Sequence, residues 1–493
     1  MELSVLLKNI EYRVVQGGNA EITSVVHDSR LACEGALFIC LRGLAADGHD
    51  YINKAAESGA SAILIEETHE NIPPDVCVIS VKNTRKAMAF VAANFYGNPA
   101  EKLRLIGVTG TNGKTTTTDF IEQILRAVGR KTGLIGTVEA RALGKPVGIA
   151  FKTSTTPDPL ELHKIFAKMA EMGVQDVVME VSSHALAFHK VDGLTFEIGV
   201  FTNLTQDHLD LHGTMENYRL AKAQLFTKCR FAVVNIDDES TPTMLEHHGA
   251  DPFVTYGIEK KADFQAIHIH TDADGIGFDL AAKPDNDTDV PCAHGCGRFF
   301  MAEKGRFNIY NALAAITTVN TLGIPLEGLC DIISHLRVPP GRIQSVSNSR
   351  NVNILVDYAH SPDGLKNIIS AVREFTSGRV VTLIGCGGER DKDKRPIMGR
   401  IAGEMSDYVI LTSDNPRNEA PMVIIEQIEE GTKGTGTPYE VCESRREAIF
   451  IGVESLNRGD SLIIAGKGHE DYQIVGTVKH HFSDYETALE ALQ

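Results

Sequence analysis

The sequence lacks any apolar run that approaches the roughly 18 residues of a membrane-spanning helix. Residues 1–13 also lack the basic start, the long apolar core and the small-residue cleavage site of a signal peptide. These two absences argue against a membrane-spanning protein and against a secreted one. We therefore expect a cytoplasmic protein with no membrane insertion.

Positive charge is scarce relative to negative charge. The chain has 48 lysines and arginines against 65 aspartates and glutamates, which gives a formal net charge of −17. Proteins that bind nucleic acid need clustered basic residues to neutralise phosphates. The charge balance therefore argues against nucleic acid as a partner, although small local basic pockets remain open.

Cysteine is sparse as well, with nine residues scattered along the chain. An odd number at irregular spacing fits reduced thiols better than a disulfide framework. Cys292 and Cys296 flank His294, which makes a zinc site the alternative. Their spacing is wrong for a zinc finger and no second pair lies nearby, so we favour the interpretation without a metal there.

The chain does have length. Its 493 residues, at about 150 per domain, predict three domains that are each large enough for a core. A hydrophobic content of 43% and a charged content of 23% are typical of soluble globular proteins. Turn-forming residues mark boundaries at 96–99 and 338–342. We therefore predict domains over residues 1–98, 99–338 and 339–493.

Short apolar runs alternate with helical patterns along the chain. This alternation predicts an α/β fold: a central, mostly parallel sheet of the P-loop ATPase type, flanked by an N-terminal α/β domain and a C-terminal Rossmann-like α/β domain. In the outer domains the predicted strands cover residues 22–26, 36–41, 62–65, 76–81, 354–357, 380–384, 408–412 and 461–465. Helices are predicted over residues 51–58 and 84–96.

Residues 105–118 read L-I-G-V-T-G-T-N-G-K-T-T-T-T and join an apolar strand to an amphipathic helix. Glycines in such a loop let several backbone N–H groups point at phosphates, in front of the positive end of the helix. Lys114 would reach the terminal phosphates and the Thr115 hydroxyl would bind Mg²⁺. Val108 stands where the common pattern has its first glycine, so the loop is a variant, and a chance G-K-T is the alternative. The residues expected to hold ATP are Gly110, Thr111, Asn112, Gly113, Lys114, Thr115 and Thr116.

Three more side chains of the central segment are candidates for a site. Glu180 ends an apolar strand near the phosphate loop, where an open α/β sheet places Mg²⁺ ligands; capping of the next helix is the alternative. His208 follows another strand. Lys222 lies close to the apolar stripe of a later helix, and a lysine that merely buries its methylenes is the alternative.

Four polar clusters follow the four predicted strands of the last segment. They read D-Y-A-H-S-P from residue 357, G-C-G-G-E-R-D from 385, S-D-N-P-R-N-E from 413 and G-K-G-H-E-D-Y from 466. Because the carboxyl ends of parallel strands meet at one edge of a sheet, we expect these clusters to form one rim and one site. Four unrelated turns are the alternative.

Together, the motifs G-T-N-G-K-T-T, E-V-S-S-H-A-L, T-N-L-T-Q-D-H-L-D-x-H-G and A-K-x-x-L-F resemble those of the Mur ligases, the ATP-dependent amide-bond-forming enzymes of bacterial cell-wall precursor synthesis. The resemblance covers essentially the whole chain. It implies catalytic roles for Lys114, Lys222 and His208, with Lys222 carbamylated by CO₂. It further implies that Thr115 and Glu180 bind one Mg²⁺ and that Lys222 with His208 serves a second, since a carbamate turns a cationic side chain into an anionic oxygen ligand.

The resemblance also implies the substrate contacts. ATP would be contacted further by Asn308, Asn311, Arg342 and Asp357, although two asparagines in the first turn of a helix can also simply cap it. The uridine nucleotide would lie at Ser29 and the 44–46 loop. The muramoyl dipeptide would be contacted by Thr155, Thr156, Ser182 and Lys190.

For the amino-acid substrate, the resemblance points to Arg390, Gly466, Glu470 and the D-N-P-R motif formed by Asp414, Asn415, Pro416 and Arg417. This motif resembles that of the branch that adds meso-diaminopimelate rather than lysine. Arg417 offers a planar bidentate donor to the second carboxylate of diaminopimelate, where lysine would place a repelled ammonium.

The implied activity is the ATP-dependent addition of meso-diaminopimelate to UDP-N-acetylmuramoyl-L-alanyl-D-glutamate through an acyl phosphate. The lysine-adding ligase, a folylpolyglutamate synthase and a nucleotide-dependent binding switch are the alternatives. The sequence departs from the family at Lys190 and Gln344, where arginine and glutamate are usual, and at Phe188, where a polar residue can occur. We expect a monomer with small-molecule partners.

Overall fold

The computed structural model describes residues 1–43, 46–67, 72–149, 155–271, 275–282, 298–303 and 305–493. The chain forms two compact units, one from Met1–Gly107, Gly129–Gly199 and Gln224–Arg230, the other from Val108–Val128, Val200–Ala223 and Phe231–Gln493. Two predicted features, the zinc alternative at Cys292, His294 and Cys296 and most of the 44–46 loop, lie outside the described residues. Within those residues, no helix is long and apolar enough to cross a membrane.

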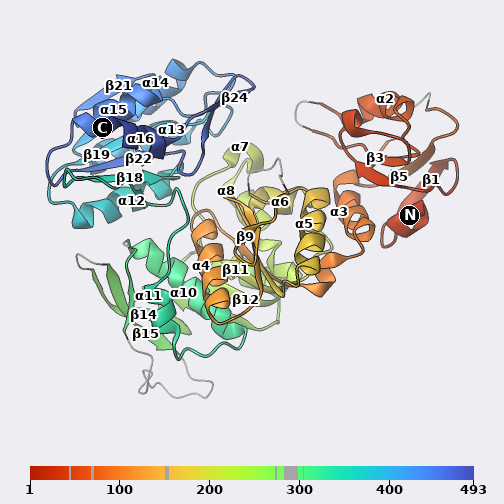
Figure 1. Ribbon diagram of the computed structural model, residues 1–493, viewed down its shortest axis with the longest axis horizontal. Coiled ribbons are helices and arrows are strands. Elements are labelled where there is room, and N and C mark those ends of the chain that lie inside the picture. The colour runs from red at the N-terminus through yellow and green to blue at the C-terminus, as the bar shows by residue number, and fades with distance from the viewer. Residues whose placement is uncertain (44–45, 68–71, 150–154, 272–274, 283–297, 304) are drawn as a thin grey trace. The chain divides into compact units, whose positions relative to one another are not determined.

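The N-terminal sheet of the first unit has the strand order β1-β5-β4-β3-β2. Alternate residues of its strands face opposite sides, so Leu37 and Leu64 join the core below α3 while Phe38 and Ile63 join the core below α2 (Figure 1). The four predicted strands are confirmed to within two residues at each end. The antiparallel edge strand β1 was not predicted, and its largely exposed residues carry little apolar pattern. The elements are β1 (Tyr12–Gln16), β2 (Ser24–Val26), β3 (Ala36–Ile39), α2 (Ile52–Glu57), β4 (Ala62–Ile65), β5 (Cys77–Val81) and α3 (Thr84–Phe95).

The remainder of the first unit carries β7 (Thr132–Ile135), which pairs in parallel with β10 (Asp176–Glu180) and antiparallel with β8 (Ala140–Ala142). Helix α5 (Pro159–Glu171) begins with a capping box formed by Asp158 and Glu161. Helix α6 (Ser183–Ala187) begins directly after β10, and the Ser182 hydroxyl caps it. This turn places Glu180 and Ser182 at the same strand end.

In the second unit, α4 (Lys114–Ala127) follows the phosphate loop, which itself follows β6 (Arg104–Thr109). Helix α10 (Arg306–Thr321) packs against α4, because both helices bury most of their side chains. The sheet strands of this unit are parallel from β12 to β14 and antiparallel from β14 to β16. They are β12 (Cys229–Asn235), β13 (Phe253–Gly257), β14 (Phe264–Thr271), β15 (Ile276–Ala282) and β16 (Phe299–Met301). The other helices of this unit before the C-terminal sheet are α7 (Leu209–His212), α8 (Met215–Ala223), α9 (Thr241–His248) and α11 (Leu329–Ser334).

The C-terminal sheet has the strand order β17-β18-β22-β19-β20-β21 and is parallel from β18 to β21. One apolar core joins it to α12, α13 and α14, and a second core, on the other face, joins it to α15 and α16 (Figure 1). The elements are β17 (Gln344–Ser345), β18 (Asn353–Asp357), α12 (Pro362–Phe375), β19 (Val380–Ile384), α13 (Lys394–Met405), β20 (Tyr408–Thr412), α14 (Pro421–Lys433), β21 (Tyr439–Cys442), α15 (Arg445–Glu454), β22 (Ser461–Ala465), β23 (Tyr472–Val475), β24 (Val478–His481) and α16 (Asp484–Ala491).

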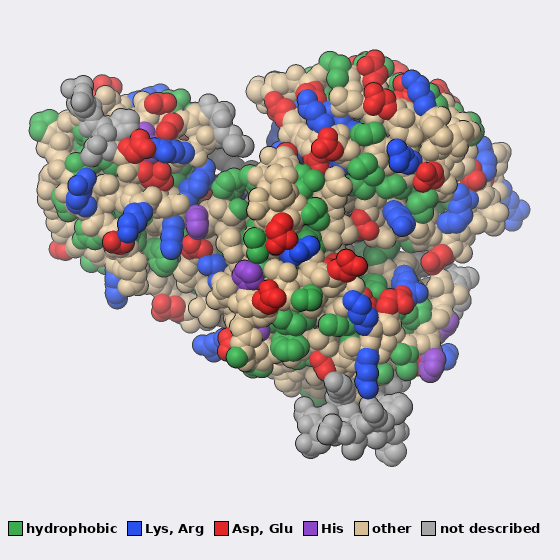
Figure 2. Space-filling view, turned by 180° about the vertical axis from the view of Figure 1, so that it is seen from behind, with side chains coloured by type: hydrophobic (Ala, Val, Ile, Leu, Met, Phe, Trp, Pro, Cys, Tyr) green, Lys and Arg blue, Asp and Glu red, His purple; other side chains and the backbone are tan. Residues whose placement is uncertain are grey.

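The predicted α/β fold class is therefore confirmed. Strands β18, β22, β19 and β20 are direct neighbours, so the four polar clusters that follow them do lie along one edge of one sheet. Acidic and basic side chains are interspersed over the face drawn in Figure 2.

Candidate active site

The conformation of the phosphate loop depends on two glycines, Gly110 and Gly113. Any other residue at either position would clash with a neighbouring side chain and force it to move. Gly110 has φ +154° and Gly113 has φ +83°. A Cβ atom at Gly110 would lie 1.8 Å from Thr202 Oγ1, and one at Gly113 would lie 2.5 Å from Asn311 Oδ1. The loop thus folds tightly between the exit of β11 (Phe196–Phe201) and α10, with Gly113 as the N-cap of α4.

The segment after β11 holds this loop through several hydrogen bonds. The N–H of Thr111 donates to the carbonyl of Asn203 (2.8 Å), and the N–H of Asn112 donates to Asn203 Oδ1 (2.9 Å). In return, Thr202 Oγ1 donates to the carbonyl of Asn112 (2.7 Å). The T-N-L-T motif therefore shapes the phosphate loop.

Two lysines meet at one carbonyl of the loop. Lys114 Nζ donates to the carbonyls of Gly110 (3.0 Å) and Thr111 (2.8 Å), and Lys222 Nζ donates to the same Gly110 carbonyl at 2.7 Å. Lys222 is only 1% exposed and lies over the Tyr218 ring. Burial, together with the charge of Lys114, holds the pKa of Lys222 well below its usual value. The alternative of an ordinary surface lysine is therefore wrong for Lys222.

His208 lies one residue from a buried carboxylate that links separate parts of the second unit. Asp207 lies 3.3 Å from Lys394 Nζ and 3.6 Å from both His208 Nε2 and His360 Nε2. Burial would raise the pKa of Asp207, but His360 and Lys394 hold it well below the usual range. A negative charge at Asp207 therefore fixes the loop that carries His208.

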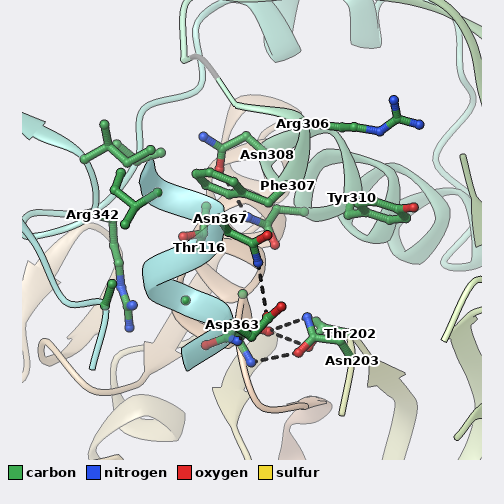
Figure 3. A pocket seen from close by; sticks show the side chains of 18 of the residues that line it. Thr116, Thr202, Asn203, Arg306, Phe307, Asn308, Tyr310, Arg342, Asp363 and Asn367 are labelled. Atoms are coloured by element: carbon green, nitrogen blue, oxygen red, sulfur yellow. Dashed lines mark hydrogen bonds between the residues drawn. The ribbon is translucent and has the colours of Figure 1, made fainter. Parts of the chain in front are cut away.

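A cavity of about 320 Å³ opens beside the phosphate loop (Figure 3). In the view of Figure 3, Arg342 lies on one side and Tyr310 on the other, with Asp363 and Asn203 below them. Seven of the residues predicted to contact ATP line it: Asn112, Gly113, Thr116, Asn308, Asn311, Arg342 and Asp357. The other four predicted residues, Gly110, Thr111, Lys114 and Thr115, are in the phosphate loop but do not line this cavity.

The sequence reasoning missed Phe307, Tyr310, Asp363 and Asn367, which also line the cavity. Asp363 accepts hydrogen bonds from Asn112 Nδ2 (2.8 Å) and Asn367 Nδ2 (3.1 Å), and burial raises its pKa. A signal was available for Asp363, since it follows the D-Y-A-H-S-P cluster directly.

The asparagines of α10 do not cap that helix. Gly305 is its N-cap, so the capping alternative for Asn308 and Asn311 is wrong. Asn311 Nδ2 instead donates to Asn308 Oδ1 (3.1 Å), and Thr117 Oγ1 donates to Asn311 Oδ1 (3.3 Å). Both amides thereby join α10 to the first turns of α4.

Arg342 and Asp357 bring the C-terminal segment to the same cavity. Arg342 Nη2 donates to Thr115 Oγ1 (3.1 Å), and its guanidinium lies 4.9 Å from the centre of the Tyr358 ring. Asp357 accepts from the N–H groups of Ile343 and Ala359, both at 2.8 Å, and burial raises its pKa. Gln344, a departure from the family, accepts from the N–H of Gly341 (2.9 Å) and so keeps a structural role.

The predicted muramoyl-dipeptide residues of the first unit form one cluster. Thr156 Oγ1 donates to the Glu180 carbonyl (3.0 Å) and to Ser182 Oγ (3.2 Å), and Lys190 Nζ donates to the Thr156 carbonyl (3.2 Å). Thr155 accepts from Thr137 Oγ1 (3.2 Å). Ser29, by contrast, is nearly buried at the start of a short 3₁₀ helix in the N-terminal sheet region.

The departures at Lys190 and Phe188 have partners in the first unit. Lys190 Nζ lies 2.9 Å from Asp158 Oδ1, and the Arg85 guanidinium lies 4.9 Å from the centre of the Phe188 ring. A single ammonium can make the contacts of Lys190 without the planar fork of an arginine.

The predicted amino-acid residues gather on the rim of the C-terminal sheet. Asn415 Nδ2 donates to Glu470 Oε2 (2.8 Å), and Lys467 Nζ donates to the same oxygen (3.0 Å). Burial would raise the pKa of Asp414, but the charges of Lys467 and Arg445 outweigh it and lower that pKa. Gly466 has φ +119°, and a Cβ there would lie 2.7 Å from Asp414 Oδ2.

Arg417 and Arg390 supply positive charge at one end of this rim. Arg417 Nη1 donates to the Gly388 carbonyl (2.7 Å), and Arg390 is exposed. Burial, and then the charge of Arg390, lowers the pKa of Arg417. A partly buried guanidinium with a second positive charge near it suits an anionic group of a ligand.

The side chains predicted to hold Mg²⁺ divide between the units: Thr115, His208 and Lys222 belong to the second and Glu180 to the first. Glu180 accepts from the N–H and the hydroxyl of Thr137, at 2.7 Å and 3.1 Å, besides ending β10. Among the residues described, no group of three or more His, Cys, Asp or Glu side chains is arranged to hold a metal.

Three sequence families match the chain: the Mur ligase family catalytic domain over residues 21–96, the Mur ligase middle domain over 108–319 and the Mur ligase glutamate ligase domain over 341–468. A ligase of Clostridium acetobutylicum named UDP-N-acetylmuramoyl-L-alanyl-D-glutamate--2,6-diaminopimelate ligase 2 is 41% identical, with both chains covered completely. The ligase of that name from Clostridioides difficile is 42% identical over 100% of this chain and 99% of its own.

Solved structures agree. A UDP-N-acetylmuramoyl-L-alanyl-D-glutamate--2,6-diaminopimelate ligase superposes with a TM-score of 0.65 at 30% identity, over 96% of this chain and 94% of that one. A folylpolyglutamate synthase of Mycobacterium tuberculosis has a TM-score of 0.62 at 16% identity, over 77% of this chain and 92% of its own, which shows a shared fold alone.

Proposed function

Because this chain belongs to the Mur ligase family, we propose that it adds meso-diaminopimelate to UDP-N-acetylmuramoyl-L-alanyl-D-glutamate, in an ATP-dependent reaction of peptidoglycan precursor synthesis. The predictions of its family and of an amide-forming ligase are confirmed by its full-length likeness to ligases of this name. The roles of individual residues that follow are part of the proposal.

One observation carries the chemistry. A buried lysine, Lys222, points its amine at the Gly110 carbonyl of the phosphate loop, 2.7 Å away. Burial, together with the charge of Lys114, holds the pKa of this amine well below its usual value, which favours its reaction with CO₂ to form a carbamate. A nucleotide switch would have no use for such a group. The geometry therefore favours a ligase over a slow nucleotide-dependent switch.

ATP would lie with its phosphates at the loop from Gly110 to Thr116 and its adenosine in the 320 Å³ cavity. Asn308 and Asn311 offer amide groups to a base, and Asp357 offers a carboxylate to ribose hydroxyls. Arg342 lies close enough to Thr115 to neutralise phosphate charge. Backbone N–H groups at the start of α4 complete this site.

The donors present fit the Mg²⁺ ions that the family implies. The Thr115 hydroxyl, the Glu180 carboxylate and a carbamate on Lys222 would offer hard oxygen atoms, and His208 would offer a ring nitrogen. Bound Mg²⁺ would neutralise the negative charge that develops on the phosphoryl oxygens. Asp207, held by Lys394, would keep His208 in position.

In the proposed reaction, the γ-carboxylate of D-glutamate takes the γ-phosphoryl group of ATP, which forms an acyl phosphate and releases ADP. The amine of meso-diaminopimelate then attacks the acyl carbon, and phosphate leaves as the amide bond forms. Lys114 would place the terminal phosphate, and the cluster of Thr155, Thr156, Ser182 and Lys190 would orient the dipeptide. Most of the catalysis would thus be positioning and charge neutralisation.

The amino-acid rim would hold meso-diaminopimelate by both charged groups of its distal end. Arg390 and Arg417 would receive the distal carboxylate, while Asp414, Asn415 and Glu470 with the Gly466 turn would hold the distal ammonium. L-Lysine lacks that carboxylate and would leave Arg417 unpaired. Ser29 would contribute to binding the uridine nucleotide.

The test is phosphate release and product formation from ATP and UDP-N-acetylmuramoyl-L-alanyl-D-glutamate, with meso-diaminopimelate in one sample and L-lysine in another. We expect product with diaminopimelate alone. Preference for L-lysine would refute the assigned role of Arg417 while leaving the ligase. No product with either amino acid would refute the proposed function.

A further inference from the structure

The two loops that carry the arginines of the amino-acid rim lie unusually close together. They follow the neighbouring strands β19 and β20. The N–H of Gly388 in the first loop donates to the carbonyl of Asn415 in the second (2.9 Å). A Cβ at Gly388 would lie 1.9 Å from the Pro416 carbonyl oxygen, so only glycine allows this approach.

The conformation of both loops is strained. Glu389 has φ +54° and Arg417 has φ +53°, a left-handed conformation that side-chain-bearing residues rarely adopt. Strand β23 and the residue that follows it hold the backbone of Arg417. The Arg417 N–H donates to the Ile474 carbonyl (3.1 Å), and the Arg417 carbonyl accepts from the N–H of Gly476 (2.8 Å). Other contacts hold the backbone of Glu389, the left-handed residue of the loop that follows β19.

These contacts come from an ion pair between Arg395 and Glu419. Arg395, on α13, has a side chain with no exposed surface, and its two terminal nitrogens donate to the two oxygens of Glu419 at 3.0 Å and 3.1 Å. The hydrogen bonds from Arg395 lower the pKa of Glu419 to about 2. Glu419 thus accepts a planar, charge-assisted fork, the strongest form of this contact.

The same two side chains also hold the backbone of the first loop. Arg395 Nη2 donates to the Gly387 carbonyl (3.1 Å), and Glu419 Oε1 accepts from the N–H of the left-handed residue Glu389. The next carbonyl, that of Gly388, is the acceptor for Arg417 Nη1 at 2.7 Å. The chain of contacts therefore runs from the ion pair, through the 387–389 backbone, to the guanidinium of Arg417.

We propose that Arg395 and Glu419 are positioning residues for the amino-acid site, which fix Arg417 so that the site selects an amino acid with a distal carboxylate. This inference rests on the proposed function and deepens it. Neither side chain need touch the substrate. Their effect is to hold the 387–389 backbone, and through the Gly388 carbonyl the Arg417 guanidinium, in one geometry.

The test compares Glu419→Gln with wild type. A glutamine has the same shape, but one carboxylate oxygen becomes an NH₂ group that faces an N–H donor of Arg395. One bond of the fork is therefore lost in either orientation, and the bond from Glu389 is lost as well if the NH₂ group takes the place of Oε1. Arg395→Lys is the second variant. It keeps the positive charge but replaces the two donor nitrogens of the guanidinium by a single ammonium, so the fork is lost. Glu429→Gln is the matched control, because Glu429 is about as exposed (19% against 17%) and pairs with Lys433 on α14 instead.

For both variants we expect KM for meso-diaminopimelate to rise by about tenfold or more. The preference for diaminopimelate over L-lysine should fall by a similar factor, while KM for ATP stays unchanged. The control, Glu429→Gln, should match wild type in KM for meso-diaminopimelate, in the amino-acid preference and in KM for ATP. If KM for ATP and the thermal midpoint change while KM for diaminopimelate and the amino-acid preference do not, the pair is merely structural and the proposal is wrong.

The wild-type measurement separates the two proposals. A wild-type protein that fails to use diaminopimelate refutes the proposed function itself. A wild-type protein that uses it, with variants that retain its KM and its preference, refutes only the role of Arg395 and Glu419. Arg395→Lys decides the matter if Glu419→Gln does not fold.

Discussion

Two neighbouring arginines on α15, Arg445 and Arg446, each make an ion pair with a residue of α16. The first pair is buried and the second is exposed. Arg445 donates through Nε and Nη2 to the two oxygens of Asp484, both at 2.7 Å, and neither side chain has any exposed surface. Arg446 pairs with Glu490, and these side chains are 55% and 49% exposed. We predict that Arg445→Ala strongly destabilises the C-terminal sheet and that Arg446→Ala does not.

The magnitude follows from what each substitution leaves behind. Without Arg445, Asp484 becomes a buried charge with its ion-pair partner removed, and the carbonyls of Ser413 and Ala465 lose their donor. Removing one partner of a buried pair costs about 3–5 kcal/mol, whereas an exposed pair contributes about 0–1 kcal/mol. Asp484→Ala should cost about as much as Arg445→Ala, because it leaves the guanidinium without its counter-ion.

Native-state hydrogen exchange, read on peptides that contain β20 and β22, measures this locally. Exchange in Arg445→Ala should accelerate roughly 150- to 4,000-fold, and in Arg446→Ala by roughly fivefold at most. Equal acceleration in the two variants would refute the argument that burial decides the cost of losing an ion pair. Ser413 and Ala465 precede Asp414 and Gly466, so the same experiment reports on the amino-acid rim.

Three further outcomes are expected. Lys222→Ala should abolish ligation but retain binding of an ATP analogue, and a short carboxylic acid should partly restore activity; equal activity without the lysine would contradict its role. Arg417→Lys should lower kcat/KM for meso-diaminopimelate by about 100-fold, since a point charge replaces a fork, and L-lysine kinetics run in parallel would expose a general loss of activity instead. Finally, Arg395 lowers the pKa of Glu419 to about 2, so the stability that Glu419 contributes should be complete above about pH 4.5 and disappear as the pH falls towards about 2. Urea titrations at several pH values should show this loss in wild type but not in Glu419→Gln. If the free energy of unfolding of the two proteins changes with pH in parallel, the pKa shift is absent.

Elements with a strong local pattern were predictable from the sequence. The strands over residues 380–384, 408–412 and 461–465 coincide with β19, β20 and β22, because short apolar runs bounded by turn residues specify a buried strand locally. Strand β1, with four of its five residues exposed, offered no such run and was missed. The phosphate loop was predictable for a similar reason, since its glycines and Lys114 act within a few residues of each other.

Contacts between distant residues could not be read in this way. The sequence placed Asn308 and Asn311 at a helix start, where capping and ligand binding were both open, and only the packing of α10 on α4 brought Asn311 to Thr117. Asp363 was overlooked because its partner Asn112 is 251 residues away.

By itself, the sequence determined the α/β class, the phosphate loop and the four polar clusters after β18, β19, β20 and β22, because each depends on neighbours along the chain. The tertiary structure alone decided that β22 lies between β18 and β19. It also decided that Arg395 meets Glu419 under the amino-acid rim. Strand order and buried ion pairs depend on which apolar faces pack together, and that is settled by the whole fold rather than by any segment of it.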